Sequence, residues 1–89
     1  MTLVMVQFKI KDYATWERGF NATKEMRSAG GLMNTRAYRS ADDPNEIIVQ
    51  SETNDPAKAK QFLSSPETRS AMEKGGVIGP PTVNFLNPV

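Results

Sequence analysis

The chain has 89 residues, which is enough for one domain and no more. It carries 11 basic and 10 acidic residues without a basic cluster, so its net charge of +1 indicates no surface for nucleic acid. Cysteine and histidine are both absent, which excludes disulfides and the usual zinc sites. Small domains are usually stabilised by disulfides, a metal site or a partner subunit, so self-association is the route to stability that remains.

No apolar run approaches the roughly 20 residues that a membrane helix needs. The first apolar stretch, Leu3–Ile10, is broken by Gln7 and Lys9 and has no basic lead-in, so it does not read as a secretion signal. We therefore expect no membrane partner and a cytoplasmic location.

The first expected element is a strand over Leu3–Ile10. Every even position from 4 to 10 is apolar, which predicts one fully buried face because side chains alternate along a strand. On the odd positions only Leu3 and Met5 are apolar, so the opposite face is expected to be half buried.

A single helix is expected next, from the N-cap Asp12 to Ala29. Its buried stripe is aromatic, at spacings of three and four residues: Tyr13, Trp16 and Phe20. The pair Gly30-Gly31 suits the end of the helix, because glycine adopts the left-handed cap conformation without a steric penalty.

An antiparallel hairpin is predicted after this helix. Its strands are Leu32–Ser40 and Glu46–Thr53, the second with three β-branched residues at its centre. The connection Ala41–Asn45 has the aspartate, proline and asparagine of a tight turn.

The second half of the chain repeats the plan of the first. Asp55 and Pro56 open a helix whose buried stripe follows: Ala59, Phe62 and Leu63. Ser64–Pro66 interrupts it, and a further short helix is expected through Met72 before two glycines end it. A final strand is predicted over Thr82–Asn87, after two prolines.

Strand–helix–strand, repeated once, predicts one α+β domain over residues 1–89 with the ferredoxin-like βαββαβ order. It closes into a four-stranded antiparallel sheet with helices on one face. The other face is wet unless a partner covers it. Apolar side chains on that face predict a homodimer through the sheet face: Leu3, Met5, Ile48 and Leu86.

Three segments, Phe8–Trp16, Tyr38–Glu46 and Met72–Pro81, resemble the dimeric α+β barrel superfamily, close to its antibiotic biosynthesis monooxygenase-like and cyclase-like small proteins. The resemblance implies a homodimer with two sheets face to face and a small pocket between each sheet and its helices. It also implies oxidation or rearrangement of aromatic polyketides or quinols without metal or flavin. The haem-degrading branch uses a histidine ligand, which this chain lacks, and no cofactor is expected.

The catalytic candidates are Asn34, Arg36 and Tyr38, which share one face of the second strand. Arg36 is suited to hold an enolate or a carboxylate, Asn34 to orient it and Tyr38 to relay a proton. The same alternation also fits a solvated strand face.

The candidates for substrate binding are Trp16, Phe20 and Asn84. Trp16 is either a core residue or a pocket wall that stacks on a planar substrate, and Asn84 joins from the last strand. The carboxylates around the hairpin turn have no metal-loop spacing, so no metal site is predicted.

These observations favour a homodimer with a small-molecule pocket, acting as a cofactor-independent monooxygenase or cyclase-like enzyme on an aromatic or polyketide-like substrate. The alternative is a non-catalytic ligand-binding or structural dimer, because acid–base groups are scarce. Whether the chain is an enzyme stays open. An RNA-binding module is not favoured, because Glu46–Thr53 has no aromatic residue to stack on bases.

Overall fold

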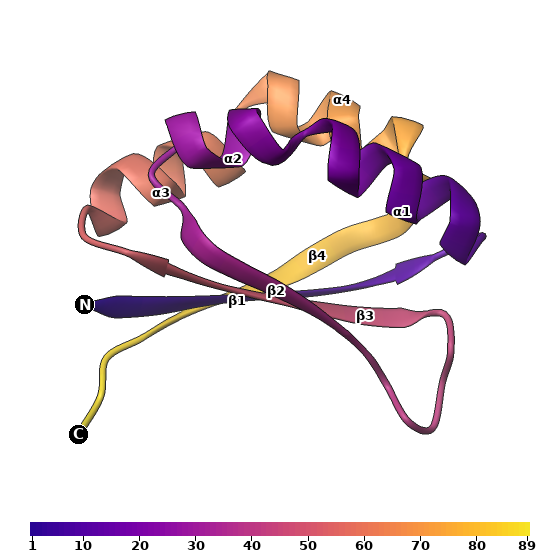
Figure 1. The fold of residues 1–89 in the computed structure, drawn as a ribbon, viewed down its shortest axis with the longest axis horizontal. Helices are drawn as coiled ribbons and strands as arrows, with labels where there is room; N and C mark the ends of the chain where they lie inside the picture. The colour runs from indigo at the N-terminus through magenta and orange to yellow at the C-terminus, as the bar shows by residue number, and fades with distance from the viewer.

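The computed structural model describes residues 1–89 and contains four strands and four helices (Figure 1). The strands are β1 (Thr2–Ile10), β2 (Met33–Arg39), β3 (Glu46–Thr53) and β4 (Val77–Leu86). The helices are α1 (Tyr13–Ala22), α2 (Lys24–Ala29), α3 (Pro56–Leu63) and α4 (Pro66–Lys74). The antiparallel sheet has the order β2-β3-β1-β4, and all four helices lie over one of its faces. This confirms the ferredoxin-like fold.

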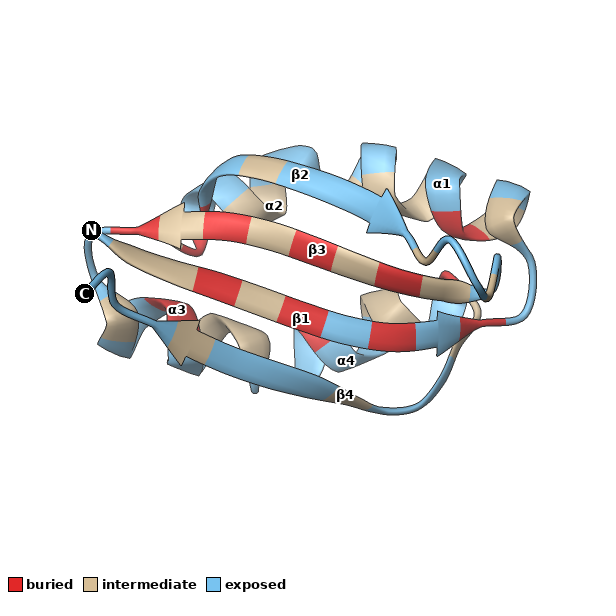
Figure 2. Cartoon of the chain, turned by 90° about the horizontal axis from the view of Figure 1, so that it is seen from below, coloured by how far each residue is buried: buried red, intermediate tan, exposed pale blue.

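The core lies between the helices and the sheet. On the two central strands Val6 is paired with Val49, and both side chains point toward the helices. Alternate residues of β1 and β3 are buried (Figure 2). The buried apolar residues form one cluster: Val4, Val6, Phe8, Ile10, Trp16, Leu32, Ile47, Val49 and Ala59.

The opposite side of the sheet, here called the open face, carries no helix (Figure 2). Apolar side chains lie on it among polar ones: Leu3, Met5, Tyr38, Ile48, Ile78 and Leu86. Of these, Ile78 is 49% exposed and Leu86 42%. Both belong to the edge strand β4, whose residues are mostly exposed.

The single helix expected from Asp12 to Ala29 is wrong, because the structure breaks it at Thr23 into α1 and α2. The Thr23 hydroxyl donates to the carbonyl oxygens of Gly19, at 3.0 Å, and Phe20, at 3.2 Å. The backbone N–H of Thr23 also turns to the Phe20 carbonyl. Threonine competes for backbone partners in this way, which favours a helix end over a helix interior.

The expected helix starts are confirmed. Asp12 and Asp55 accept from backbone N–H groups of the first turns of α1 and α3, and Ser65 does the same for α4. Helix α4 continues two residues beyond the expected Met72, to Lys74, where Gly75 caps it. None of the helices has the length and apolar character that a membrane crossing requires.

The last strand starts five residues earlier than expected, at Val77 rather than Thr82. The prediction excluded Pro80 and Pro81, but β4 is an edge strand, where a residue without an N–H is tolerated. The pairing with β1 shifts register between Gln7 and Lys9, and Gly79, which lies in the bulged stretch of β4, has φ +71. Because of this bulge, β4 includes both prolines without being interrupted.

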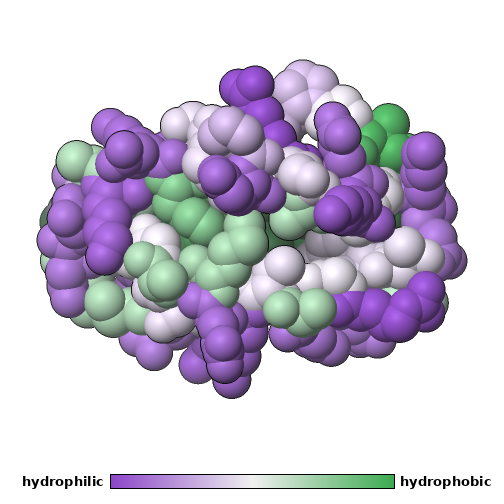
Figure 3. All heavy atoms as spheres, turned by 90° about the horizontal axis from the view of Figure 1, so that it is seen from above, coloured by the Kyte–Doolittle hydropathy of each residue, from purple (hydrophilic) through white to green (hydrophobic).

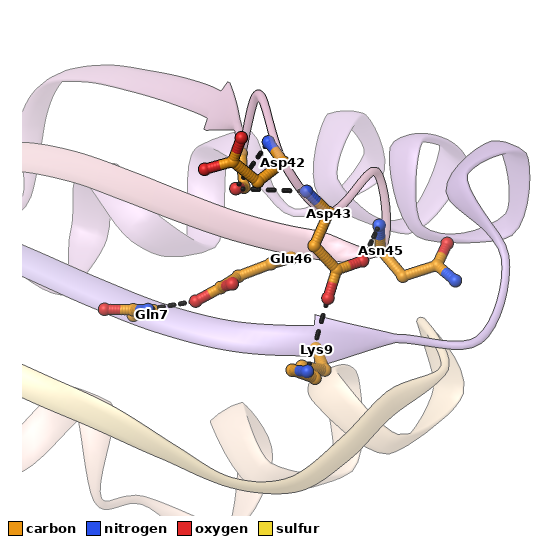
Figure 4. Close-up of polar contacts among 7 residues, drawn as sticks. Gln7, Lys9, Asp42, Asp43, Asn45 and Glu46 are labelled. Carbon is orange, nitrogen blue, oxygen red and sulfur yellow. Dashed lines mark hydrogen bonds and ion pairs between the residues drawn. The ribbon is translucent and has the colours of Figure 1, made fainter.

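The β2–β3 turn is held by polar groups of the turn itself and of the neighbouring strand β1 (Figure 4). Asp43 pairs with Lys9 at 3.2 Å and accepts from the backbone N–H of Asn45 at 2.9 Å. The pKa of Asp43 lies below its ordinary value because of the Asn45 N–H and Lys9. Glu46 accepts from the Gln7 amide on the neighbouring strand. These carboxylates are therefore engaged in holding the turn, as the turn-like sequence indicated.

Candidate functional site

A hollow of about 470 Å³ lies between the α1–α2 pair and the start of β2, on the helix side of the sheet. We call it the Arg27 hollow. It is lined by nine residues: Phe20, Asn21, Lys24, Arg27, Ser28, Leu32, Met33, Asn34 and Thr35. Its volume is within the range of small-molecule sites in proteins. Phe20 and Asn34 are the two residues that the sequence had already selected.

Arg27 is half-buried and lies over the Phe20 ring, with its guanidinium carbon 3.8 Å from the ring centroid. Its Nη1 donates to the Phe20 carbonyl oxygen at 2.8 Å and to the Thr23 hydroxyl at 2.9 Å. No carboxylate pairs with Arg27, and burial lowers its pKa. A partly desolvated cation without an anionic partner favours an anion supplied from outside the chain.

The charged residues that line the Arg27 hollow are all positive. Lys24 and Arg27 bring two positive charges, and no aspartate or glutamate is among the nine residues. Phe20 and Leu32 supply apolar surface, while amide and hydroxyl groups come from the remaining polar residues. This combination suits a planar apolar ligand that carries a negative charge.

The position of the hollow depends on a short connection between α2 and β2. Gly31 has φ +91, which turns the chain directly from the helix end into the strand. Leu32 is thereby buried beneath α2, and Thr35 contacts the buried hydroxyl of Ser51 at 2.8 Å. The floor of the hollow is thus fixed to β3, the strand next to it.

The three catalytic candidates are brought together, but mainly on the open face. Asn34, Arg36 and Tyr38 line a second hollow of about 390 Å³ with Gln50 and Glu52 of β3. The Asn34 amide donates to the Glu52 carboxylate at 2.5 Å. Asn34 has φ +51 at the bulge that starts β2, and it borders both hollows.

The structure separates the substrate-binding candidates. Trp16 is 5% exposed in the core, with its ring centroid 4.8 Å from that of Phe20. Asn84 lies on the open face of β4, opposite Met5. Three strand spacings, roughly 14 Å, lie between β4 and β2, so Asn84 does not reach the hollow of Arg36 within one chain. The roles of these residues remain predictions.

Sequence reasoning did not select Arg27 or Lys24 as site residues. The one signal was that Phe20 and Arg27 are seven residues apart, which places them on the same side of a helix. On a continuous helix that spacing corresponds to about 10 Å along the axis. The break at Thr23 is associated with the closer approach that lets the guanidinium reach the ring.

The helix side also has a wide groove between the α1–α2 pair and α4, of about 650 Å³. In Figure 3, hydrophilic residues form much of the outline of the molecule, and residues of intermediate or apolar hydropathy lie in the middle of the view. Glu67 and Lys74 both line the groove, and small residues form much of the remainder. Because the charges are mixed, this groove indicates no particular ligand.

No protein-family model and no curated protein matches the chain. Solved structures do match it. A proposed antibiotic biosynthesis monooxygenase from Bordetella bronchiseptica is 14% identical, with a TM-score of 0.83 over 99% of this chain and 96% of that one. SnoaB, a cofactor-independent oxygenase from Streptomyces nogalater, is 13% identical, with a TM-score of 0.76 over 99% and 92%. Rv0793 from Mycobacterium tuberculosis is 17% identical, with a TM-score of 0.71 over 99% and 94%.

These alignments extend over nearly the whole of each chain at low sequence identity. They show that this chain has the ferredoxin-like fold of the antibiotic biosynthesis monooxygenase structures, which confirms the resemblance at the level of fold. The fold alone does not identify a function, because one fold hosts many activities.

Proposed function

We propose that the Arg27 hollow binds a small aromatic molecule as its enolate or phenolate, and that the chain is a cofactor-independent oxygenase of such molecules. The observation that carries this proposal is the unpaired Arg27 guanidinium, held 3.8 Å above the Phe20 ring in a hollow without carboxylates. The description of SnoaB as a cofactor-independent oxygenase supports the reaction class.

In this proposal the protein acts by stabilising negative charge on the ligand. Lys24 and Arg27 favour the enolate over the neutral form, which lowers the pKa of the bound molecule. Phe20 and Leu32 add apolar surface to the lining beside the guanidinium. None of the nine lining side chains is a carboxylate or an imidazole that could accept the ligand proton, so that proton passes to water. The substrate must therefore be acidic itself, as a phenol-bearing anthrone or quinol is.

The reaction then consumes molecular oxygen directly. For an anthrone, the methylene carbon loses two hydrogens and gains one oxygen atom as a carbonyl, and the second oxygen atom leaves as water. Oxygen is the oxidant and the enolate is the electron donor. The electron-rich enolate is the species that reacts, so its stabilisation is the contribution that Arg27 and Lys24 make.

We also propose that a second copy of the chain covers the open face. Helices cover only one side of the sheet, and the open face leaves apolar side chains exposed on β4. The half-buried Met5 and Ile48 lie at the centre of that face, on neighbouring strands. Exposed apolar surface of this kind favours association. Arg36 and Tyr38 would then lie at the interface between the two copies.

The oxygenase proposal is tested with a dihydroxyanthrone in air-saturated buffer containing a metal chelator. We expect anthraquinone formation coupled to oxygen uptake above the spontaneous rate, and a rate at least tenfold lower for Arg27→Gln. Arg18→Gln is the matched control, since Arg18 is an exposed arginine of α1 and is not among the nine residues that line the Arg27 hollow. Equal rates for wild type and Arg27→Gln would overturn the proposal.

A second candidate is ligand binding without chemistry. The observation in its favour is that the Arg27 hollow offers no side chain that takes up a proton near neutral pH. This candidate expects the anthrone to bind with Arg27-dependent affinity while oxygen uptake stays at the spontaneous rate. Binding and turnover measured on the same samples distinguish the two functions.

A further inference from the structure

A third hollow lies at the other side of the molecule, where α3 and α4 pack over the edge strand β4. It has a volume of about 350 Å³. Its lining includes Lys60, Leu63, Arg69, Met72, Val83 and Phe85. β2 and β4 are the two opposite edges of the sheet, so this hollow is separate from the Arg27 hollow. We call it the β4 hollow.

The floor of the β4 hollow is apolar and only partly covered. Val83 and Phe85 both point to the helix side of β4, since they pair with the buried Val6 and Val4. Val83 is nevertheless 38% exposed. Leu63 and Met72 form the facing wall. Covering such surface with the apolar part of a ligand is favourable in proportion to the area removed from water.

The polar part of the lining is cationic. Lys60 and Arg69 are its two charged residues, and no carboxylate lines the hollow. The Lys60 ammonium lies 5.1 Å from the centroid of the Phe85 ring, directly over the floor. Neither cation has an ion-pair partner, because the one ion pair of the structure joins Lys9 and Asp43.

One acidic residue, Glu73, lies near the β4 hollow. Glu73 lines an adjoining hollow with Arg69, Met72 and the two prolines. It is one helical turn from Arg69, yet the two form no ion pair. Glu73 therefore leaves Lys60 and Arg69 available to an anion placed on the β4 side.

We propose that the β4 hollow is a binding site for an anionic amphiphile, specifically a medium-chain fatty acid. The carboxylate lies between Lys60 and Arg69, and the chain covers Val83 and Phe85. Charge complementarity assigns the head group, and the apolar floor assigns the tail. The small volume favours a medium chain over a long one.

The experiment is a calorimetric titration of the whole chain with decanoate below its micelle concentration. Decylamine and decanol are the comparison ligands, because they keep the chain and change the head group. We expect saturable binding of decanoate and at least tenfold weaker binding of decylamine. Equal affinity for all three ligands, or no saturable binding of decanoate, would overturn the proposal.

Charge-removing variants locate the site. The double variant Lys60→Gln, Arg69→Gln is expected to bind decanoate at least tenfold more weakly than wild type. Lys11→Gln, Lys74→Gln removes the same charge from positions outside the hollow and is expected to retain wild-type affinity. Equal weakening by both double variants would show a general charge effect and contradict the assignment.

A variant of the floor provides an independent readout. Val83→Glu places a negative charge on the exposed part of the edge strand and is expected to abolish decanoate binding. Its circular dichroism spectrum and melting midpoint establish whether it folds. Amide shifts of Phe85 and Met72 in titrations of wild type provide evidence that does not depend on any variant. Decanoate that shifts Phe20 and Leu32 instead would place it in the Arg27 hollow and overturn the proposal.

Discussion

Gly30 and Phe62 lie so close together that a β-carbon built on Gly30 would be 2.4 Å from Cγ of the Phe62 ring. Gly30 has φ −78, so its own backbone conformation is open to any residue. The glycine is therefore required by packing between the end of α2 and α3. This contact fixes how closely the two helix pairs approach over the sheet.

Gly30→Ala is expected to destabilise the fold by about 1–3 kcal/mol, because the Phe62 ring must leave its place against the core. Gly19→Ala is the matched control. A β-carbon on Gly19 would lie 3.6 Å from Cα of Gly75, an ordinary contact, and alanine favours a helix interior by about 0.5–1 kcal/mol. Urea denaturation should thus give opposite signs for the same substitution. Destabilisation of equal size at both positions would contradict the packing argument.

Thr23→Ala is expected to weaken ligand binding in the Arg27 hollow, although Thr23 is not part of its lining. The Thr23 hydroxyl accepts from Arg27 Nη1 at 2.9 Å and so positions the guanidinium over Phe20. We expect a several-fold rise in Kd for the anthrone, with Kd restored by Thr23→Ser, which keeps the hydroxyl. Fluorescence titration measures both. A threonine that served only to end α1 would leave the serine and alanine variants with the same Kd.

The stability of the chain should depend on Asp43 at neutral pH and lose that dependence in acid. The pKa of Asp43 is lowered in the folded state by the Asn45 N–H and Lys9, so its contribution is fully present above the ordinary value of 3.8. It disappears as pH falls through the lower folded pKa. Asp43→Asn should therefore be less stable than wild type at neutral pH.

The difference between wild type and Asp43→Asn should shrink as the pH falls well below 3.8, because both side chains are then neutral. Denaturation midpoints across this range check the sign. Asp42→Asn is the control, since the Asp42 side chain is exposed and forms no ion pair with Lys9. A gap that widened toward acid would contradict the assignment.

Met5→Glu is expected to shift the chain toward the monomer, because Met5 lies at the centre of the open face that we propose a second copy covers. A charge buried without a partner at an interface is costly. Ala29→Glu adds the same charge on the exposed end of α2 and should leave the dimer intact. Light scattering coupled to size-exclusion chromatography gives the mass of each. A wild-type chain that is monomeric at high concentration would contradict the proposed dimer.

The sequence by itself determined those features that depend on neighbours along the chain. Alternating apolar residues predicted β1 and a run of β-branched residues predicted β3, because both patterns are local. Capping residues predicted the helix starts at Asp12 and Asp55, because a cap bonds within one turn. The repeated order of elements was then sufficient for the ferredoxin-like arrangement.

Only the tertiary structure decided on which face of the sheet each candidate residue lies. Trp16 and Arg36 lie on opposite sides of the sheet, and β4 accepts Pro80 because it is an edge strand, a property set by strands distant in sequence. The break at Thr23 brings Arg27 to Phe20, where a continuous helix had been expected. The edge position of β4 and the side of the sheet on which a residue lies are set by pairing between distant segments, which no local pattern of residues encodes. The contact between Arg27 and Phe20 spans seven residues, but it depends on where the helix ends, and the helical spacing alone does not give that position.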